Sequence, residues 1–215
     1  MTRFSLTSAI AVAALAVAAP ALAGPPLLCH PYDIGGARSL PWSAGAGWNQ
    51  PSPDYNLKNL VADTESLLSP STPIIVRMET LRRASIYASA DAQIARDLLS
   101  RLMARATGSE KRGHPEALAF LDAAYLTEAF NEITMLTKTP PFQDRVAGVR
   151  AAIGSADGRA LIAKSLWAEP DNPTLHFAAA LISSSDRSAY EQHAAKARAG
   201  AAKDPLLAKN IDHVS

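Results

Sequence analysis

Residues 115–137 read PEALAFLDAAYLTEAFNEITMLT and carry the strongest helix signal in the chain. Apolar side chains recur there at steps of three and four residues, which places them on one stripe of an α-helix; they are Leu118, Leu121, Tyr125, Ala129, Ile133 and Leu136. Such a stripe needs an apolar surface on another element to cover it. We therefore expect a long helix over residues 115–137 with a partner helix packed against it.

Pairs of a short polar residue and a proline mark further helix starts along the chain: Ser52-Pro53, Thr72-Pro73, His114-Pro115, Asn172-Pro173 and Asp204-Pro205. The polar side chain can accept amide hydrogens of the first turn, and proline at the next position loses no hydrogen bond. Helix-forming residues fill the stretches between them. We predict helices over residues 53–68, 73–88, 91–106, 115–137, 142–153, 156–167, 173–182 and 187–202, with a short ninth over 205–211. Short connections favour antiparallel neighbours, so the predicted fold is all-α, built of stacked helical hairpins.

One of these turns recurs at a spacing close to one tetratricopeptide unit, first as Asn172-Pro173 and then as Asp204-Pro205. With the small residues of the helices between them, the segment Lys164 to Ile211 resembles that repeat family. The Trp and Leu-Gly positions of the family's first helix are not matched, and one period is visible. The resemblance implies stacked hairpins that expose a concave face to a peptide or protein.

Residues 1–23 have the features of an export signal. Arg3 is their only charged residue, an apolar run follows from Ala9 to Ala19, and Pro20 precedes the small-x-small site Ala21-Leu22-Ala23. The run is shorter than the roughly 20 residues that span a bilayer, and no later stretch is long enough. We therefore expect a protein without a membrane span that begins at Gly24 after processing and works in the periplasm or outside the cell.

Charge argues against nucleic acid as a partner. Loss of Arg3 with the signal makes the number of basic residues equal to that of the 20 acidic ones, whereas nucleic-acid binders carry a basic patch. Arginines cluster between Arg77 and Arg105, but Glu79, Asp91 and Asp97 lie among them, so a solvated mixed-charge helix face is predicted. The carboxylates Glu116, Asp122 and Glu128 are likewise interpreted as solvated.

Residues 24–52 differ from the predicted helical domain at 53–215. Proline and glycine are frequent there, which predicts irregular backbone, yet Tyr32, Trp42 and Trp48 offer apolar surface that a disordered leader would lack. We expect this segment to pack along the helical body and these three aromatic residues to contact a protein or peptide partner. The GPP-x-x-C-H start, the later SLPW, and the stretches RMETLRRA and DAAYL resemble a group of uncharacterised exported bacterial proteins, a resemblance that implies no function.

Cys29, the single cysteine, lies beside His30. In an oxidising compartment it could be buried, free and reactive, bridged to a second chain in a disulfide-linked dimer, or bound to a metal or cofactor. Copper, zinc or haem would suit these ligand types. Neighbouring residues of an extended chain point to opposite faces, however, and neither C-x-x-C nor H-x-x-x-H occurs. A packed structural cysteine is the favoured interpretation.

No stretch of sequence supplies a catalytic motif. Gly45-Ala46-Gly47 lacks the third glycine and the preceding strand of a dinucleotide site, and Gly154 to Gly158 reads as a helix stop followed by a Ser155 cap. We therefore predict no catalytic residues and an exported, non-catalytic binding or scaffolding protein of the cell envelope. The alternative is a metal- or redox-handling protein that uses Cys29 and His30.

Overall fold

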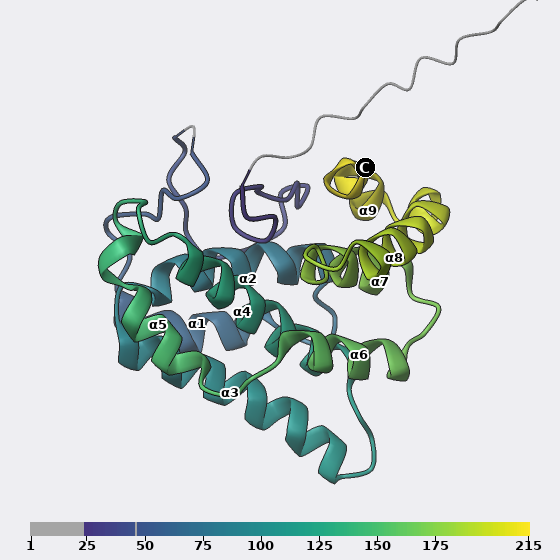
Figure 1. The fold of residues 1–215 in the computed structure, drawn as a ribbon, viewed down its shortest axis with the longest axis horizontal. Coiled ribbons are helices and arrows are strands. Elements are labelled where there is room, and N and C mark those ends of the chain that lie inside the picture. The colour runs from purple at the N-terminus through teal and green to yellow at the C-terminus, as the bar shows by residue number, and fades with distance from the viewer. Residues whose placement is uncertain (1–23, 46) are drawn as a thin grey trace, which may run out of the picture.

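The computed structural model describes residues 24–45 and 47–215 of the chain, so the predicted export signal at residues 1–23 lies outside the described residues. The described residues form nine α-helices, and the only pairing of extended backbone among them is an isolated bridge between Trp42 and Pro51. The predicted all-α class is confirmed (Figure 1). The helices are α1 (Leu60–Leu67), α2 (Ile74–Ala88), α3 (Ala92–Lys111), α4 (Ala117–Met135), α5 (Val146–Ile153), α6 (Gly158–Ala168), α7 (Pro173–Ile182), α8 (Arg187–Gly200) and α9 (Pro205–Asn210).

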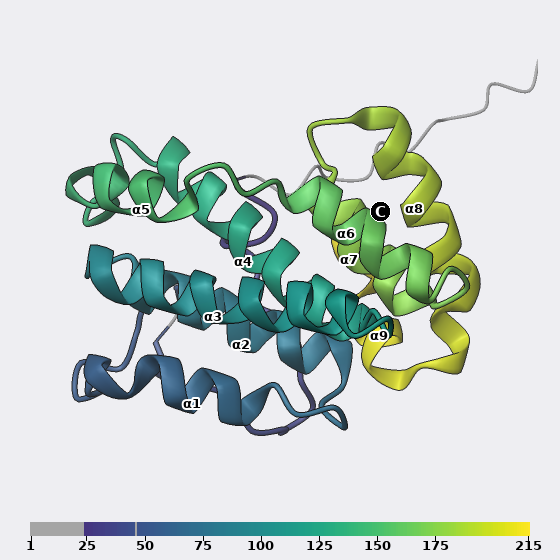
Figure 2. The ribbon, with the colours of Figure 1, turned by 90° about the horizontal axis from the view of Figure 1, so that it is seen from below.

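Helix α4 is the centre of the molecule and packs against α2, α3, α5, α6 and α7 (Figures 1 and 2). The predicted stripe is buried at Leu121, Tyr125, Ala129 and Ile133, and it is partly buried at its ends. Burial extends beyond the stripe to Phe120 and other residues on the remaining sides of the helix. A helix that is apolar all round is covered all round, so α4 has several partner helices.

The predicted helix starts are correct where an acidic or amide side chain caps the helix. Asn172 accepts from the amides of Thr174 and Leu175 at the start of α7, and Asp204 caps α9 in the same way. Asp91 and Asp186 cap α3 and α8.

Four predicted caps are wrong. Glu116, not His114, stands at the N-cap position of α4, and no side chain caps that helix. The chain after Ser52 stays irregular until a 3-10 turn at Leu57–Asn59, which Asn56 caps, so the first helix does not begin at Pro53. Thr72 donates its hydroxyl to the carbonyl of Leu67 instead of capping α2. Asp157, not Ser155, accepts the first amides of α6, because its carboxylate lies nearer to the helix. The predicted end of α5 at Gly154, with φ +57°, is correct.

Residues 24–52 lie across α2 and α4, and their first turns are next to α9 (Figure 1). Leu27, Leu28, Tyr32 and Leu40 belong to the main hydrophobic core, and Tyr32, the most exposed of them, is 4% exposed. The carboxamide of Asn210, close to the C-terminus, accepts from the amide of Asp33 and donates to its carbonyl. The two ends of the described chain are thus packed side by side.

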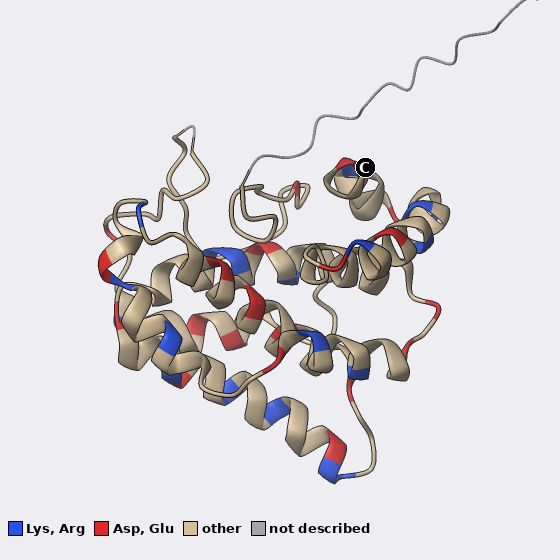
Figure 3. Cartoon of the chain, viewed as in Figure 1, with Lys and Arg blue, Asp and Glu red and all other residues tan. Residues whose placement is uncertain are grey.

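The predicted solvated arginine face is wrong for its first members. Arg77 and Arg82 are fully buried in α2, and Arg77 Nε and Nη2 donate to both oxygens of the buried Asp122 at 2.8 and 2.6 Å. Asp122 is therefore not the solvated carboxylate that its sequence context indicated. Helix α2 is covered by α4 on one side and by residues 24–52 on the other, so its charges are paired inside the protein. Arg96 and Arg101 on α3 are exposed as expected, and elsewhere both signs of charge are interspersed along the helices (Figure 3).

Candidate functional site

Cys29 lies at the edge of the core, partly buried, in a turn in which the amides of Leu28 and Cys29 both donate to the carbonyl of Pro25. Gly24 is so close that an added Cβ would lie 3.1 Å from the Cys29 Sγ. Burial, together with the negative charge of Glu132, raises the pKa of the Cys29 thiol to about 11. The thiol is therefore protonated at neutral pH, and a protonated thiol is neither a good nucleophile nor a good metal ligand.

His30 packs its ring edge-on against His213, with 6.2 Å between ring centroids. Burial lowers the pKa of His213, and nearby His30 lowers it further, so His213 is neutral at pH 7. The structure thus brings a second histidine, from the C-terminal end of the chain, to the predicted Cys29 and His30 pair. Within the described residues, no group of three histidine, cysteine, aspartate or glutamate side chains could hold a metal ion. Metal or haem binding here stays a prediction.

The three predicted partner-binding aromatic residues contact the protein itself. Tyr32 is buried and stacks on His213. Trp42 lies beneath the guanidinium groups of Arg82 and Arg83, whose Cζ atoms are 5.0 and 5.7 Å from the centre of its ring. Trp48 stacks on Phe142 with 5.5 Å between the ring centroids. Trp42 and Trp48 nevertheless stay partly exposed, so partner contact through these aromatic residues stays a prediction.

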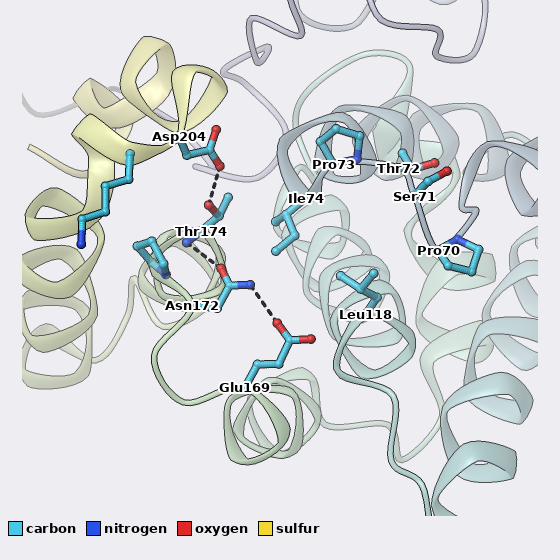
Figure 4. A pocket seen from close by; sticks show the side chains of 12 residues that line it. Pro70, Ser71, Thr72, Pro73, Ile74, Leu118, Glu169, Asn172, Thr174 and Asp204 are labelled. Carbon is cyan, nitrogen blue, oxygen red and sulfur yellow. Dashed lines mark hydrogen bonds between the residues drawn. The ribbon is translucent and has the colours of Figure 1, made fainter.

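An open depression with a volume of about 610 Å³ lies where three turns meet. Its floor is formed by Ile74 from the first turn of α2 and Leu118 from the first turn of α4 (Figure 4). The stretch Pro70–Pro73 before α2 forms one wall. The other wall comes from the turn between α6 and α7 and the turn between α8 and α9. None of these residues was predicted to form a site.

Two smaller depressions neighbour this one, and each shares lining residues with it. A depression of about 350 Å³ shares Pro70, Leu118 and Glu169 with it and continues toward Arg105 and Pro115. Another of about 380 Å³ shares Pro173 and Lys203 with it and continues along α8 toward His176. We call these three adjoining depressions the trough. A row of neighbouring depressions suits an elongated ligand better than a compact one.

Hydrogen bonds fix the wall formed by the two C-terminal turns. Thr174 Oγ1 donates to Asp204 at 2.8 Å, the Thr174 amide donates to Asn172 Oδ1 at 3.0 Å, and Asn172 Nδ2 donates to Glu169 at 2.8 Å (Figure 4). The same Asp204 and Asn172 side chains cap α9 and α7. The wall is therefore rigid, and it carries two carboxylates, Glu169 and Asp204, on the central depression.

His176 at the far end of the trough is held in one neutral form. Its Nε2 lies 2.9 Å from the carbonyl oxygen of Pro170, which can only accept, so Nε2 carries the hydrogen. Its Nδ1, 3.0 Å from Nδ1 of His193, therefore accepts from that ring. Burial lowers the pKa of both histidines. The side chains of Asn172, Asp204 and His176 are thus engaged in helix caps and in this histidine pair.

Comparisons of the chain with family models, with curated proteins and with solved structures gave no match. In the part of the chain that the structure describes, no helix is long and apolar enough to cross a membrane.

The trough could have been only partly predicted from the sequence. Thr72-Pro73, Asn172-Pro173 and Asp204-Pro205 all stand out as turns. What the sequence lacks is any sign that these turns, which are far apart along the chain, converge on one face.

Proposed function

We propose that this chain is an exported, non-catalytic binding or scaffolding protein of the cell envelope, and that its trough holds an extended segment of a partner protein. The observation that carries the proposal is the row of three neighbouring depressions that share lining residues, the central one with an apolar floor between polar walls. An extended peptide rises about 3.3 Å per residue and presents alternate side chains to the floor and to solvent. A groove that is long, open and apolar at its base fits that shape.

The charges of the central depression favour one kind of peptide. Glu169 and Asp204 lie on the same wall, and Lys203 is the basic residue among those that line this depression. A lysine or arginine of the partner would find a carboxylate there, while aliphatic side chains would cover Ile74 and Leu118. The proposed ligand is therefore an extended segment in which apolar and basic residues alternate.

The C-terminal helices support the finer proposal of a tetratricopeptide-like unit. Asn172 and Asp204 cap their helices through the same pair of amide hydrogen bonds, and a proline follows each. Small residues are buried between α7 and α8, and Gly200 lies against Pro173. Arrays of this kind bind peptides on an exposed face, and here that face would be the trough.

The proposal of export is tested separately from binding. Intact mass spectrometry of protein recovered from the periplasm or the culture medium should give the mass of a chain that begins at Gly24. An N-terminus that retains the predicted signal would contradict export by this route.

Binding is tested with a library of peptides of about ten residues, roughly 33 Å when extended, selected on immobilised protein and measured individually by fluorescence polarisation. We expect enrichment of peptides that combine aliphatic and basic residues. Leu118→Arg should abolish their binding, because it places a long cation on the trough floor. Met135→Arg is the matched control, since Met135 is 71% exposed and lies outside the trough. Equal loss in both variants, or no enrichment, would overturn the proposal.

The second candidate is metal or redox handling at Cys29 and His30, including a disulfide-linked dimer through Cys29. The observation that favours it is the ring of His213 beside His30. Bound copper or zinc would have to displace the proton that burial holds on the thiol. Native mass spectrometry with and without reductant would show bound metal, haem or a covalent dimer, and Cys29→Ser should remove each; persistent absence of all three would contradict this candidate.

A further inference from the structure

Side chains of the helical body hold main-chain atoms of residues 27–41 in a way that resembles the capture of a peptide. Four of these side chains lie on one face of α2, at spacings of three and four residues: Glu79, Arg82, Arg83 and Tyr87. The Glu79 carboxylate accepts from the amide of Tyr32 at 3.1 Å, and Arg82 Nη1 donates to the carbonyl of Leu28 at 3.1 Å. These contacts involve backbone atoms of the segment and not its side chains.

The same pattern continues along the segment. Arg83 Nη1 donates to the carbonyl of Leu40 at 2.6 Å, and the Tyr87 hydroxyl donates to the carbonyl of Pro41 at 2.7 Å. Helix α4 contributes at the other end. There both oxygens of the Glu132 carboxylate accept from the Leu27 amide at 3.1 and 3.0 Å, and the Tyr125 hydroxyl donates to the Leu27 carbonyl at 2.7 Å.

The receiving side chains also hold one another. Arg82 Nε and Nη2 bind both oxygens of the Glu79 carboxylate at 2.7 and 2.9 Å, and Arg83 Nε binds it at 2.7 Å. Burial alone would raise the pKa of Glu79, but its ion pairs with the two arginines lower it, so the carboxylate is charged when it receives the Tyr32 amide. From this cluster, Glu79 Oε2, Arg82 Nη1 and Arg83 Nη1 contact main-chain atoms of the segment.

Apolar side chains of the segment enter the body at intervals between these polar contacts. Leu27 and Leu28 are buried at one end, Tyr32 lies in the middle and Leu40 at the other end. Main-chain hydrogen bonds with side-chain pockets at selected positions are the arrangement by which proteins bind extended peptides: the first gives affinity and the second gives specificity.

We propose that this face of α2 and α4 is a peptide-binding groove, separate from the trough, whose ligand is an irregular main chain with turns at residues 25–29 and 34–37 and with leucine and tyrosine at the pocket positions. Its occupant in this structure is the chain's own segment 24–44. The segment is thus a resident ligand that can leave the groove and be replaced by the same segment from a second copy.

The test uses the full chain with a protease site inserted between Ala44 and Gly45, cleaved after folding. We expect the fragment to remain bound through size-exclusion chromatography, and a fluorescent synthetic peptide of residues 24–44 to replace it over time. Tyr125→Phe removes the hydroxyl that holds the Leu27 carbonyl and should speed this exchange about 2- to 10-fold. Tyr190→Phe on α8 is the control and should leave the exchange rate unchanged.

Backbone recognition is tested directly by N-methylation of the synthetic peptide. Methylation at Leu27 removes the amide hydrogen that Glu132 accepts. It should weaken the ability of the peptide to displace the bound fragment by about 10-fold or more, relative to methylation at Ile34. Equal competition by the two peptides would overturn the proposal. Loss of helical circular dichroism on cleavage would also overturn it, because the segment would then be an integral part of the core and not a ligand.

Discussion

The substitution Gly200→Ala tests the close packing of α8 against the start of α7. Its backbone, at φ −99° and ψ −8°, is ordinary right-handed helix, and replacing glycine with alanine in a helix normally stabilises a protein by about 0.5–1 kcal/mol. A Cβ on Gly200, however, would lie 2.3 Å from Cβ and 2.6 Å from Cγ of Pro173. The proline ring cannot turn away, because it is part of the backbone of α7. Overpacking of this kind costs about 1–3 kcal/mol, so we expect Gly200→Ala to lower the free energy of unfolding by about 1–2 kcal/mol.

Gly108→Ala in α3 is the matched control. A Cβ there would lie 3.3 Å from Nη1 of Arg112, the mobile end of a long side chain, so this variant should gain about 0.5–1 kcal/mol. Urea unfolding followed by circular dichroism measures both changes. A similar gain of stability in the two variants would refute the reasoning, and it would remove the geometric support for a tetratricopeptide-like unit.

Three further predictions concern buried ionisable groups. Arg77→Met removes the bidentate partner of the buried Asp122 and leaves it only the longer contact with Arg105 at 3.7 Å, so it should cost about 3–5 kcal/mol in the same urea assay. Arg101→Met on the exposed face of α3 should change stability by less than about 0.5 kcal/mol. Burial raises the pKa of Glu132 from 4.5 to about 8, so the folded state binds this proton more tightly than the unfolded chain does. Its contribution to stability is therefore complete below pH 4.5 and lost as the pH rises to 8, and the decline of urea midpoints across that window should be smaller in Glu132→Gln. The Cys29 thiol, with a pKa of about 11, should react slowly with Ellman's reagent at neutral pH in the folded protein and fast in urea; fast reaction of the folded protein would contradict its burial.

The core around α4 could be predicted because its apolar residues recur at helical spacing within one short stretch. The helix α2 was predicted, but the burial of its charged side chains could not be predicted in the same way. Arg77, Glu79 and Arg82 look like a solvated face in the sequence, and only the folded chain shows that Asp122 and the carbonyl of Leu28 are their partners. A buried ion pair has no local sequence signature when its partners are as far apart in the chain as Arg77 and Asp122 are.

The candidate sites, too, could be predicted from the sequence only in part. The N-terminal aromatic residues were singled out correctly as apolar surface, but the sequence does not show whether such surface faces a partner or the protein's own helices. Trp48, for example, stacks on Phe142 from a distant part of the chain. The trough depends on the convergence of three turns, which is a property of helix packing and not of any single turn.

The contact between Asp33 and Asn210 has a consequence for the order of folding. Ribosomes make the N-terminal end first, and a translocating chain delivers that end first as well. The amide and carbonyl of Asp33 nevertheless pair with a carboxamide close to the other end of the chain, and the ring of Tyr32 stacks on His213. Contacts of such large sequence separation form late, because the loop between them must close. The leading segment therefore finds its last partners only after nearly the whole chain has been made, so the N-terminal contacts complete the fold.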